Sequence, residues 1–232
     1  EKLVATGNPT YIKQMTQDGQ DVEYSSESLQ ADYFPRKSLW VLTQRAVAWK
    51  SRDRLRIKGD KIEIYNKEGH LEEMKAEGKP ATIRKMLPDS TVIDYNSESL
   101  KVHYLPAQSL LTLTENAVAW QPSEQLRVKG DQIDIFFQED SRVKKMTSYG
   151  RPTRIKKLSL VDGQEEFRSK SLQADYFPGQ LFLLSKSAVV WKSDGTYVGE
   201  KIEYDLETKI AKAVGEPKSK KRVRVILQPQ TK

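Results

Sequence analysis

The stretch SLQADYFP occurs twice in this chain, at residues 28–35 and again, letter for letter, at residues 171–178. A looser copy, SLKVHYLP, lies between them at residues 99–106. The prolines that end the three copies are 71 and 72 residues apart. Because self-similarity at a fixed period is typical of repeat architectures, the three copies predict an array of similar units.

Three further motifs recur with the same spacing and extend the repeat over most of the chain. The first is Ala-Val-x-Trp, which begins at Ala46, Ala117 and Ala188. The second comprises the related segments IKGDKIEI at 57–64, VKGDQIDI at 128–135 and VGEKIEY at 198–204. The third is Gly-x-Pro, which begins at Gly7, Gly78, Gly150 and Gly215. We therefore expect one continuous array over residues 1–232. Its predicted parts are a partial unit at about 1–25 and units at about 26–96, 97–168 and 169–232.

Apolar and polar residues alternate within each unit. Leu29, Ala31 and Tyr33 alternate with polar neighbours, and a period of two indicates a half-buried strand. Clusters such as Gln17-Asp18-Gly19 are turn sequences between such runs. The second strand of each unit, for example residues 39–42, is apolar on both faces. The sequence predicts an all-β, antiparallel fold with five or six short strands per unit.

Bulk composition limits the possible functions only broadly. The chain has 232 residues, 37% of them hydrophobic, no cysteine and a formal net charge of +7. No apolar run approaches the roughly 20 residues that span a bilayer as a helix. The positive charge favours anionic partners, but a solvated basic surface explains it equally well. Nucleic acid is not an expected partner, because the aromatic residues are interleaved with aliphatic residues rather than with Arg and Lys.

Residues typical of catalysis or metal binding are scarce. The two histidines, His70 and His103, have no neighbour at the spacing of a metal site or a catalytic triad. The adjacent carboxylates Glu72 and Glu73 would point to opposite faces of a strand. We expect no enzymatic activity, no metal and no cofactor.

Both ends of the chain are predicted to present open strand edges. The first residues, LVATGNPTYIK, read as the end of a unit, and RVRVIL at 222–227 alternates like a strand with no partner after it. An open edge can pair with another chain, so we expect head-to-tail self-association through the terminal strands. The basic run from Lys218 either protects this edge from aggregation or binds anions.

Several of these motifs, in this order, resemble the LptA/OstA-like family of periplasmic lipopolysaccharide-transport bridge proteins. The matching stretches are Ala5–Pro9, Ala76–Pro80, Leu42–Ala48, Ile57–Ile62, Tyr197–Asp205 and Arg222–Pro229. The resemblance implies a twisted, V-shaped, open β-jellyroll with an apolar groove that holds the acyl chains of lipopolysaccharide. It also implies a periplasmic location, with the signal peptide not part of this chain. Implied partners are lipopolysaccharide and other lipopolysaccharide-transport components at both membranes.

By the same resemblance, apolar residues on one face of the strands would line the groove. They are Ile12, Leu29, Ala31, Tyr33, Leu39, Val41, Ala46, Ala48, Ile57, Ile62, Ile83, Leu100, Val102, Tyr104, Ala117, Ala119, Val128, Ile133, Ile155, Leu172, Ala174, Tyr176, Ala188, Val198 and Ile202. Trp49, Trp120 and Trp191 alternate out of phase with the alanines and would face the other way. The alternative is a structural β-repeat scaffold or adhesin without a lipid ligand, in which this face is closed core.

Overall fold

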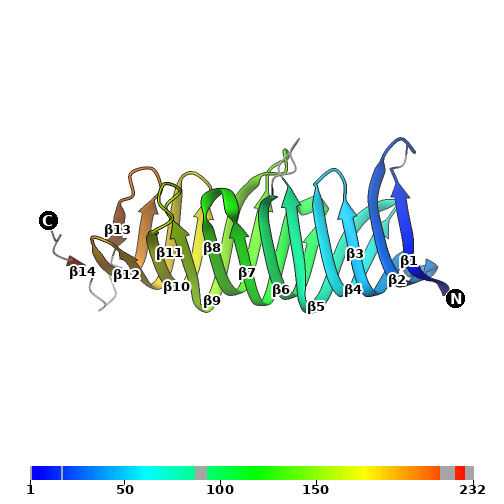
Figure 1. The fold of residues 1–232 in the computed structure, drawn as a ribbon, viewed down its shortest axis with the longest axis horizontal. Helices are drawn as coiled ribbons and strands as arrows, with labels where there is room; N and C mark the ends of the chain where they lie inside the picture. The colour runs from blue at the N-terminus through cyan, green and yellow to red at the C-terminus, as the bar shows by residue number, and fades with distance from the viewer. Residues whose placement is uncertain (1, 17, 87–92, 215–222, 228–232) are drawn as a thin grey trace. The chain divides into compact units, whose positions relative to one another are not determined.

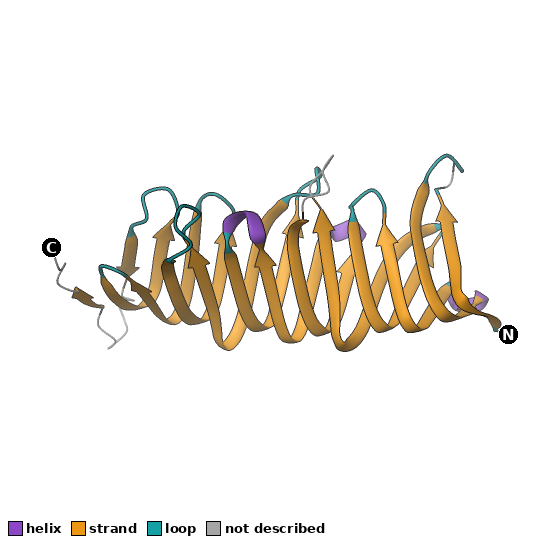
Figure 2. Cartoon of the chain, viewed as in Figure 1, coloured by secondary structure: helices purple, strands orange, loops and turns teal. Residues whose placement is uncertain are grey.

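The computed structural model describes residues 2–16, 18–86, 93–214 and 223–227. The chain is almost entirely β-strand (Figure 2), and the strands form an antiparallel sheet in which spatial order follows chain order from β1 to β13 (Figure 1). The all-β, antiparallel prediction is therefore confirmed. Within the described ranges, no helix has the length and hydropathy of a membrane-spanning segment.

The chain divides into two compact units. The first comprises Glu1–Ala117 and Phe137–Arg142, and the second comprises Val118–Phe136 and Val143–Lys232. The first unit contains β1 (Leu3–Met15), β2 (Val22–Phe34), β3 (Leu39–Lys50), β4 (Leu55–Lys67), β5 (His70–Met86) and β6 (Ile93–Leu105), with short 3₁₀ turns η1 (Pro35–Lys37) and η2 (Pro106–Gln108). Strand β7 (Leu110–Gln121) has residues in both units.

The second unit holds the remaining elements. They are η3 (Pro122–Glu124), β8 (Leu126–Phe137, whose last residue belongs to the first unit), β9 (Val143–Leu158), β10 (Glu165–Phe177), β11 (Leu181–Lys192), β12 (Gly195–Asp205), β13 (Ala211–Val214) and β14 (Arg224–Leu227). Strand β14 pairs with β12, which gives the predicted C-terminal strand a partner within its own chain.

The strands are longer and fewer than the sequence predicted, because each long strand continues through a bend. In β2 to β5 the pairing register shifts near the middle of the strand, for example between Glu27 and Gln30 and between Thr43 and Ala46. These shifts divide every long strand of the first unit into two halves. We call the halves that carry residues 10–15, 22–28, 46–50, 55–59, 81–86 and 93–99 arm A, and those that carry 3–6, 30–34, 39–43, 61–67, 70–77 and 101–105 arm B.

The motif that opens the sequence contains one of these bends. Ser28 is buried, and its hydroxyl donates a hydrogen bond to the carbonyl oxygen of Gln30 at 2.8 Å. Ser99 and Ser171 make the same bond to the residue two positions later, each at 2.7 Å. The serine hydroxyl thus bonds the backbone across the bulge in the same way in all three copies.

The neighbouring strands use other residues for the same bend. In β3, Gln44 and Arg45 both have positive φ angles, of 62° and 63°. In β4, a Cβ on Gly59 would lie 2.6 Å from the carbonyl oxygen of Glu77, so the close approach of β5 requires glycine there. The first three Gly-x-Pro motifs lie at or beside register shifts, at Gly7, Gly78 and Gly150. The fourth, at Gly215, lies outside the described residues.

The two arms of the first unit pack their apolar faces against each other. Asn66 at the end of arm B donates a hydrogen bond to the hydroxyl of Tyr24 in arm A at 2.9 Å. Tyr95, at the start of β6, stacks with Phe137 at 6.1 Å between ring centroids. In the second unit, Phe167 contacts both Phe182 and Tyr204, at 5.3 and 4.3 Å. The core therefore lies between the arms, and we call the strand faces that enclose it the buried face.

Candidate functional site

Strand register aligns the buried face into transverse layers. In arm B of the first unit, directly opposed residues form one layer, whose exposed fractions are 0 to 3%: Ala31, Leu42, Ile62, Ala76 and Val102. A second layer lies beside it and is richer in large side chains: Tyr33, Trp40, Ile64, Met74 and Tyr104. Directly opposed residues of an antiparallel sheet share a face, so each layer is a continuous apolar strip.

Arm A and the second unit repeat this arrangement. Arm A carries a layer of small and branched residues, namely Ser26, Ala48, Ile57, Ile83 and Ser97. In the second unit the corresponding layers are Ser148, Ala174, Leu184, Ile202 and Ala213, and Met146, Tyr176, Phe182, Tyr204 and Ala211. Each unit therefore encloses an apolar interior of similar composition.

Most of the predicted groove residues belong to this buried face. Eighteen of them are buried, namely Leu39, which lies on the opposite face, and Ala31, Ala46, Ala48, Ile57, Ile62, Ile83, Val102, Tyr104, Ala117, Ala119, Val128, Ile133, Ile155, Ala174, Tyr176, Ala188 and Ile202. Ile12 and Tyr33 are partly exposed, and they lie opposite Ser26 and Trp40. Their contact with a lipid stays a prediction. Trp49 lies on the other face from Ala48, opposite Ser25 and Arg56.

Three of the predicted residues are misplaced because of the bend. Leu29, Leu100 and Leu172 each follow the serine of the bulge and lie outside the buried core, and Leu172 is 44% exposed. The extra residues at the bulge reverse the alternation, so the serine and the residue three positions later share the buried face. The prediction that Leu29 shares a face with Ala31 is wrong for this reason.

Three more residues are misplaced for other reasons. Leu39 and Val41 pair with Phe34 and Asp32, so they lie on the opposite face from Leu42, which pairs with Ala31. Val198 pairs with Val189, whereas Tyr197 pairs with the buried Val190. Because the third repeat is shorter before Gly199, the position of Ile57 is occupied by Tyr197 and not by Val198.

Several large residues of the buried face were not among the predicted groove residues. They are Trp40, Leu42, Ile64, Met74, Leu111, Leu113, Phe182, Leu184 and Tyr204. Many belong to strands that are apolar on both faces, where the alternation of apolar and polar residues does not indicate which face is buried. The pairing of Leu42 with Ala31 identifies the buried side.

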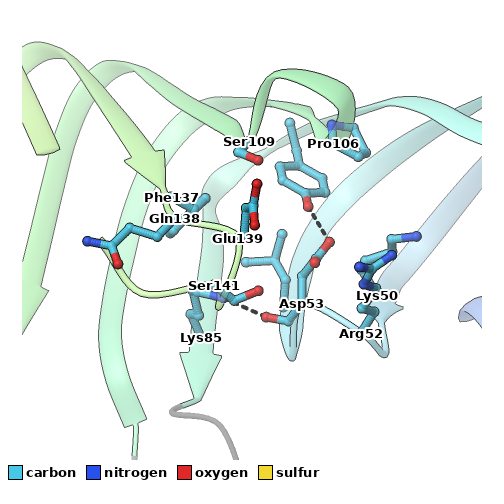
Figure 3. Close-up of a pocket in the computed structure, with 12 residues that line it drawn as sticks. Lys50, Arg52, Asp53, Lys85, Pro106, Ser109, Phe137, Gln138, Glu139 and Ser141 are labelled. Carbon is cyan, nitrogen blue, oxygen red and sulfur yellow. Dashed lines mark hydrogen bonds between the residues drawn. The ribbon is translucent and has the colours of Figure 1, made fainter. Parts of the chain in front are cut away.

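Hydrogen bonds at the strand ends, some between the arms and some within one arm, lie at the rim of the interior. In the first unit, Tyr104 donates its hydroxyl hydrogen to the carboxylate of Asp53, which lies in the turn between β3 and β4. Lys85 donates to the carbonyl oxygen of the same Asp53 at 2.6 Å (Figure 3). In the second unit, Tyr176 donates to Gln121 at 3.3 Å, and Lys157 donates to the carbonyl oxygen of Glu124 at 2.8 Å. The rim contacts thus repeat with the units.

Burial shifts the acid–base equilibria of these rim residues. The pKa of Tyr104 is raised because its hydroxyl is buried beside the Asp53 carboxylate. Burial lowers the pKa of Lys85, whose side chain is buried and whose ammonium lies 4.8 Å from the Phe137 ring centre, while Asp53, Asp94 and Asp140 oppose the shift. A cavity of about 390 Å³ lies at this rim, and Lys50, Asp53, Lys85 and Glu139 are among the residues that surround it (Figure 3).

The described strands enclose an apolar interior. Within the ranges that the structure describes, no three His, Cys, Asp or Glu residues are grouped so that they could hold a metal ion. His103, which was singled out in the sequence, pairs with Glu73 away from the buried face. The interior can therefore enclose apolar groups if the arms separate.

Comparison with known proteins identifies the family. The model of the LptA/(LptD N-terminal domain) LPS transport protein family matches residues 50–133 and 124–210. The crystal structure of LptH, the LptA homologous periplasmic component of the conserved lipopolysaccharide transport device from Pseudomonas aeruginosa, is similar in fold. The TM-score is 0.52 with 20% sequence identity, over 58% of this chain and 95% of that chain. No curated protein matches the sequence. Since the family model covers more than half of the residues, the chain belongs to the LptA/(LptD N-terminal domain) family of LPS transport proteins.

Proposed function

We propose that this chain is a non-enzymatic periplasmic carrier that holds the acyl chains of lipopolysaccharide between its arms. Other lipopolysaccharide-transport components are its proposed partners, and copies of the chain associate head to tail through terminal strands. The proposed repeat units, 26–96, 97–168 and 169–232, each supply part of one continuous array. Membership of a lipopolysaccharide-transport family supports this proposal.

The observation that carries the proposal is the repetition of apolar layers on the buried face. A lipid gains about 0.8 kcal/mol for each methylene group that it buries against such a face. Since the layers in both units have similar composition, an acyl chain meets similar surfaces in each. Similar affinity at successive positions favours transfer over trapping.

Loading requires the two arms to part at the rim. The Tyr104 hydrogen bond to Asp53 and the Asn66 hydrogen bond to Tyr24 join the two arms, so both would break. A hydrogen bond contributes about 1 kcal/mol net, so burial of a few methylene groups offsets each of them. The exposed ends of the arms would then receive the acyl chains.

Filling the interior tests the proposal. Ala76→Trp places a large side chain in the arm B layer, and we expect it to reduce lipopolysaccharide binding by the purified chain at least about tenfold, measured by the lipid retained after gel filtration. Glu77→Trp adds the same side chain at the exposed neighbouring position and should bind as the unsubstituted chain does. Circular dichroism checks that each variant folds. If Ala76→Trp does not fold, Ala76→Leu is tested in its place. Equal binding by Ala76→Trp and Glu77→Trp would contradict the proposal.

A structural scaffold without a lipid ligand is the second candidate. The closed packing of the arms favours it, because the layer around Leu42 and Ile62 has no solvent-accessible surface. This candidate predicts no lipopolysaccharide binding by the folded chain, and therefore the same gel-filtration experiment separates the two.

A further inference from the structure

The outer face of arm A in the first unit carries a transverse row of basic and aromatic side chains. Strand pairing places Lys13 opposite Ser25, Ser25 opposite Trp49, Trp49 opposite Arg56, and Arg56 opposite Arg84. Because directly opposed residues share a face, the row crosses five neighbouring strands, β1 to β5, on the side away from Ala48 and Ile57. A cavity of about 770 Å³ is lined by this row, and also by Ile12 and Ser26, which oppose each other on the buried face. Its volume is within the range of sites that hold small ligands.

The charge of this cavity is one-sided. Among the described residues that line it, five are basic, namely Lys13, Lys50, Arg54, Arg56 and Arg84, and none is a carboxylate. Lys50 is paired with Glu23 at 3.3 Å. Within the described residues, no ion pair joins Lys13, Arg56 or Arg84 to an acidic side chain, and the buried Nε of Arg56 has no hydrogen-bond partner. These three cations are therefore available to an anion.

The cavity also has apolar walls. The guanidinium of Arg56 lies over the Trp49 ring, 5.4 Å from its centre, at the distance of a cation–π contact. Tyr11 is 69% exposed and Met86 is 38% exposed, and both line the cavity. A ligand that fits must combine a compact anion with an apolar or ring-shaped part. Phosphate-bearing lipid headgroups have this combination, and arginine binds their oxygens through paired N–H donors.

We propose that this cavity binds the phosphate group of an anionic lipid headgroup through the cations of the outer face. Arg56 and Arg84 bind the phosphate oxygens, Lys13 adds positive charge, and Trp49, Tyr11 and Met86 contact the neighbouring glycerol and acyl carbons. The site would hold the outer face of arm A against an anionic membrane surface. The inference does not depend on lipopolysaccharide lying between the arms.

Vesicle flotation of the full chain tests the site. The chain should float with phosphatidylglycerol-containing phosphatidylcholine vesicles and not with vesicles of phosphatidylcholine alone. Arg56→Gln/Arg84→Gln should weaken the association about 10- to 30-fold, since each basic residue at an anionic surface contributes about a factor of five. Arg36→Gln/Lys37→Gln removes the same charge from the exposed turn η1, which does not line the cavity, and should change binding less than about threefold. Circular dichroism verifies that all variants fold.

Three results would overturn the inference. The first is that the chain does not bind the anionic vesicles. The second is that Arg56→Gln/Arg84→Gln and Arg36→Gln/Lys37→Gln weaken vesicle binding equally. The third is that inorganic phosphate, at the same concentration as the lipid phosphate, displaces the chain from the vesicles. Tighter binding of a single-stranded oligonucleotide, lost in the same Arg56→Gln/Arg84→Gln variant, would assign the site to nucleic acid instead. Binding of lipopolysaccharide between the arms is a separate readout, because Arg56→Gln/Arg84→Gln leaves the buried face unchanged.

Discussion

Ile57→Asp is expected to lower the free energy of unfolding by about 4 kcal/mol, a large part of the total stability of a domain. Ile57 is 1% exposed and lies in the arm A layer between Ala48 and Ile83. A carboxylate there would lose its hydration among apolar neighbours, since the directly opposed Ala48 and Ile83 offer no hydrogen bond or charge, and the isoleucine packing would be lost as well. Urea unfolding followed by circular dichroism measures the effect.

The matched control is the next residue in the chain. Lys58→Asp introduces the same side chain on the exposed outer face, and we expect a change within about 0.5 kcal/mol. Similar losses in Ile57→Asp and Lys58→Asp would mean that the arms do not pack against each other as described.

Alkaline pH is expected to destabilise the fold through Tyr24. Burial raises the pKa of Tyr24 from 10.0 to about 12, and Asn66 donates a hydrogen bond to its hydroxyl oxygen. Because the protonated form is favoured in the folded state, the stabilisation is fully present below pH 10 and is lost as the pH rises through 12. The loss from this residue is about 2 to 3 kcal/mol. Urea midpoints measured at intervals between these pH values should fall accordingly.

Tyr24→Phe isolates this contribution. The variant should be less stable at neutral pH by about 1 kcal/mol, through the lost hydrogen bond, but its stability should fall less steeply above pH 10. Tyr204 adds to the same trend, because burial and the nearby Glu166 raise its pKa. Lys85 acts in the opposite direction, since its lowered pKa makes the folded state gain stability as the pH rises toward the ordinary lysine value. Parallel curves for Tyr24→Phe and the unsubstituted chain would contradict the assignment.

The sequence predicted the repeat, the strand class and most of the buried face, because alternation and spacing are local properties. Ala48, Ile57 and Ile62 could be placed correctly from their neighbours alone. Leu29 could not be placed by alternation, because the bulge at Ser28 reverses the phase within the same strand. The recurrence of serine before leucine in all three copies was the available indication of that bend.

Other features depend on contacts that no local pattern contains. The side of β3 that faces the interior is decided by the pairing of Leu42 with Ala31, since residues 39–42 are apolar throughout. The rim bond between Tyr104 and Asp53 joins residues that are 51 positions apart. The basic row on arm A is assembled from five different strands, so its residues look like scattered surface charges in the sequence.

Site-specific photo-crosslinking tests the central claim most directly. A benzophenone amino acid replaces Tyr104 on the buried face in one protein and His103, which faces Glu73 on the outer side, in a second. Both folded proteins are irradiated with purified lipopolysaccharide, and adducts are detected with an antibody against the lipid. We predict adducts at position 104 and none at position 103. Absence of adducts at position 104 in a folded, β-rich protein would contradict the claim that lipopolysaccharide occupies the space between the arms.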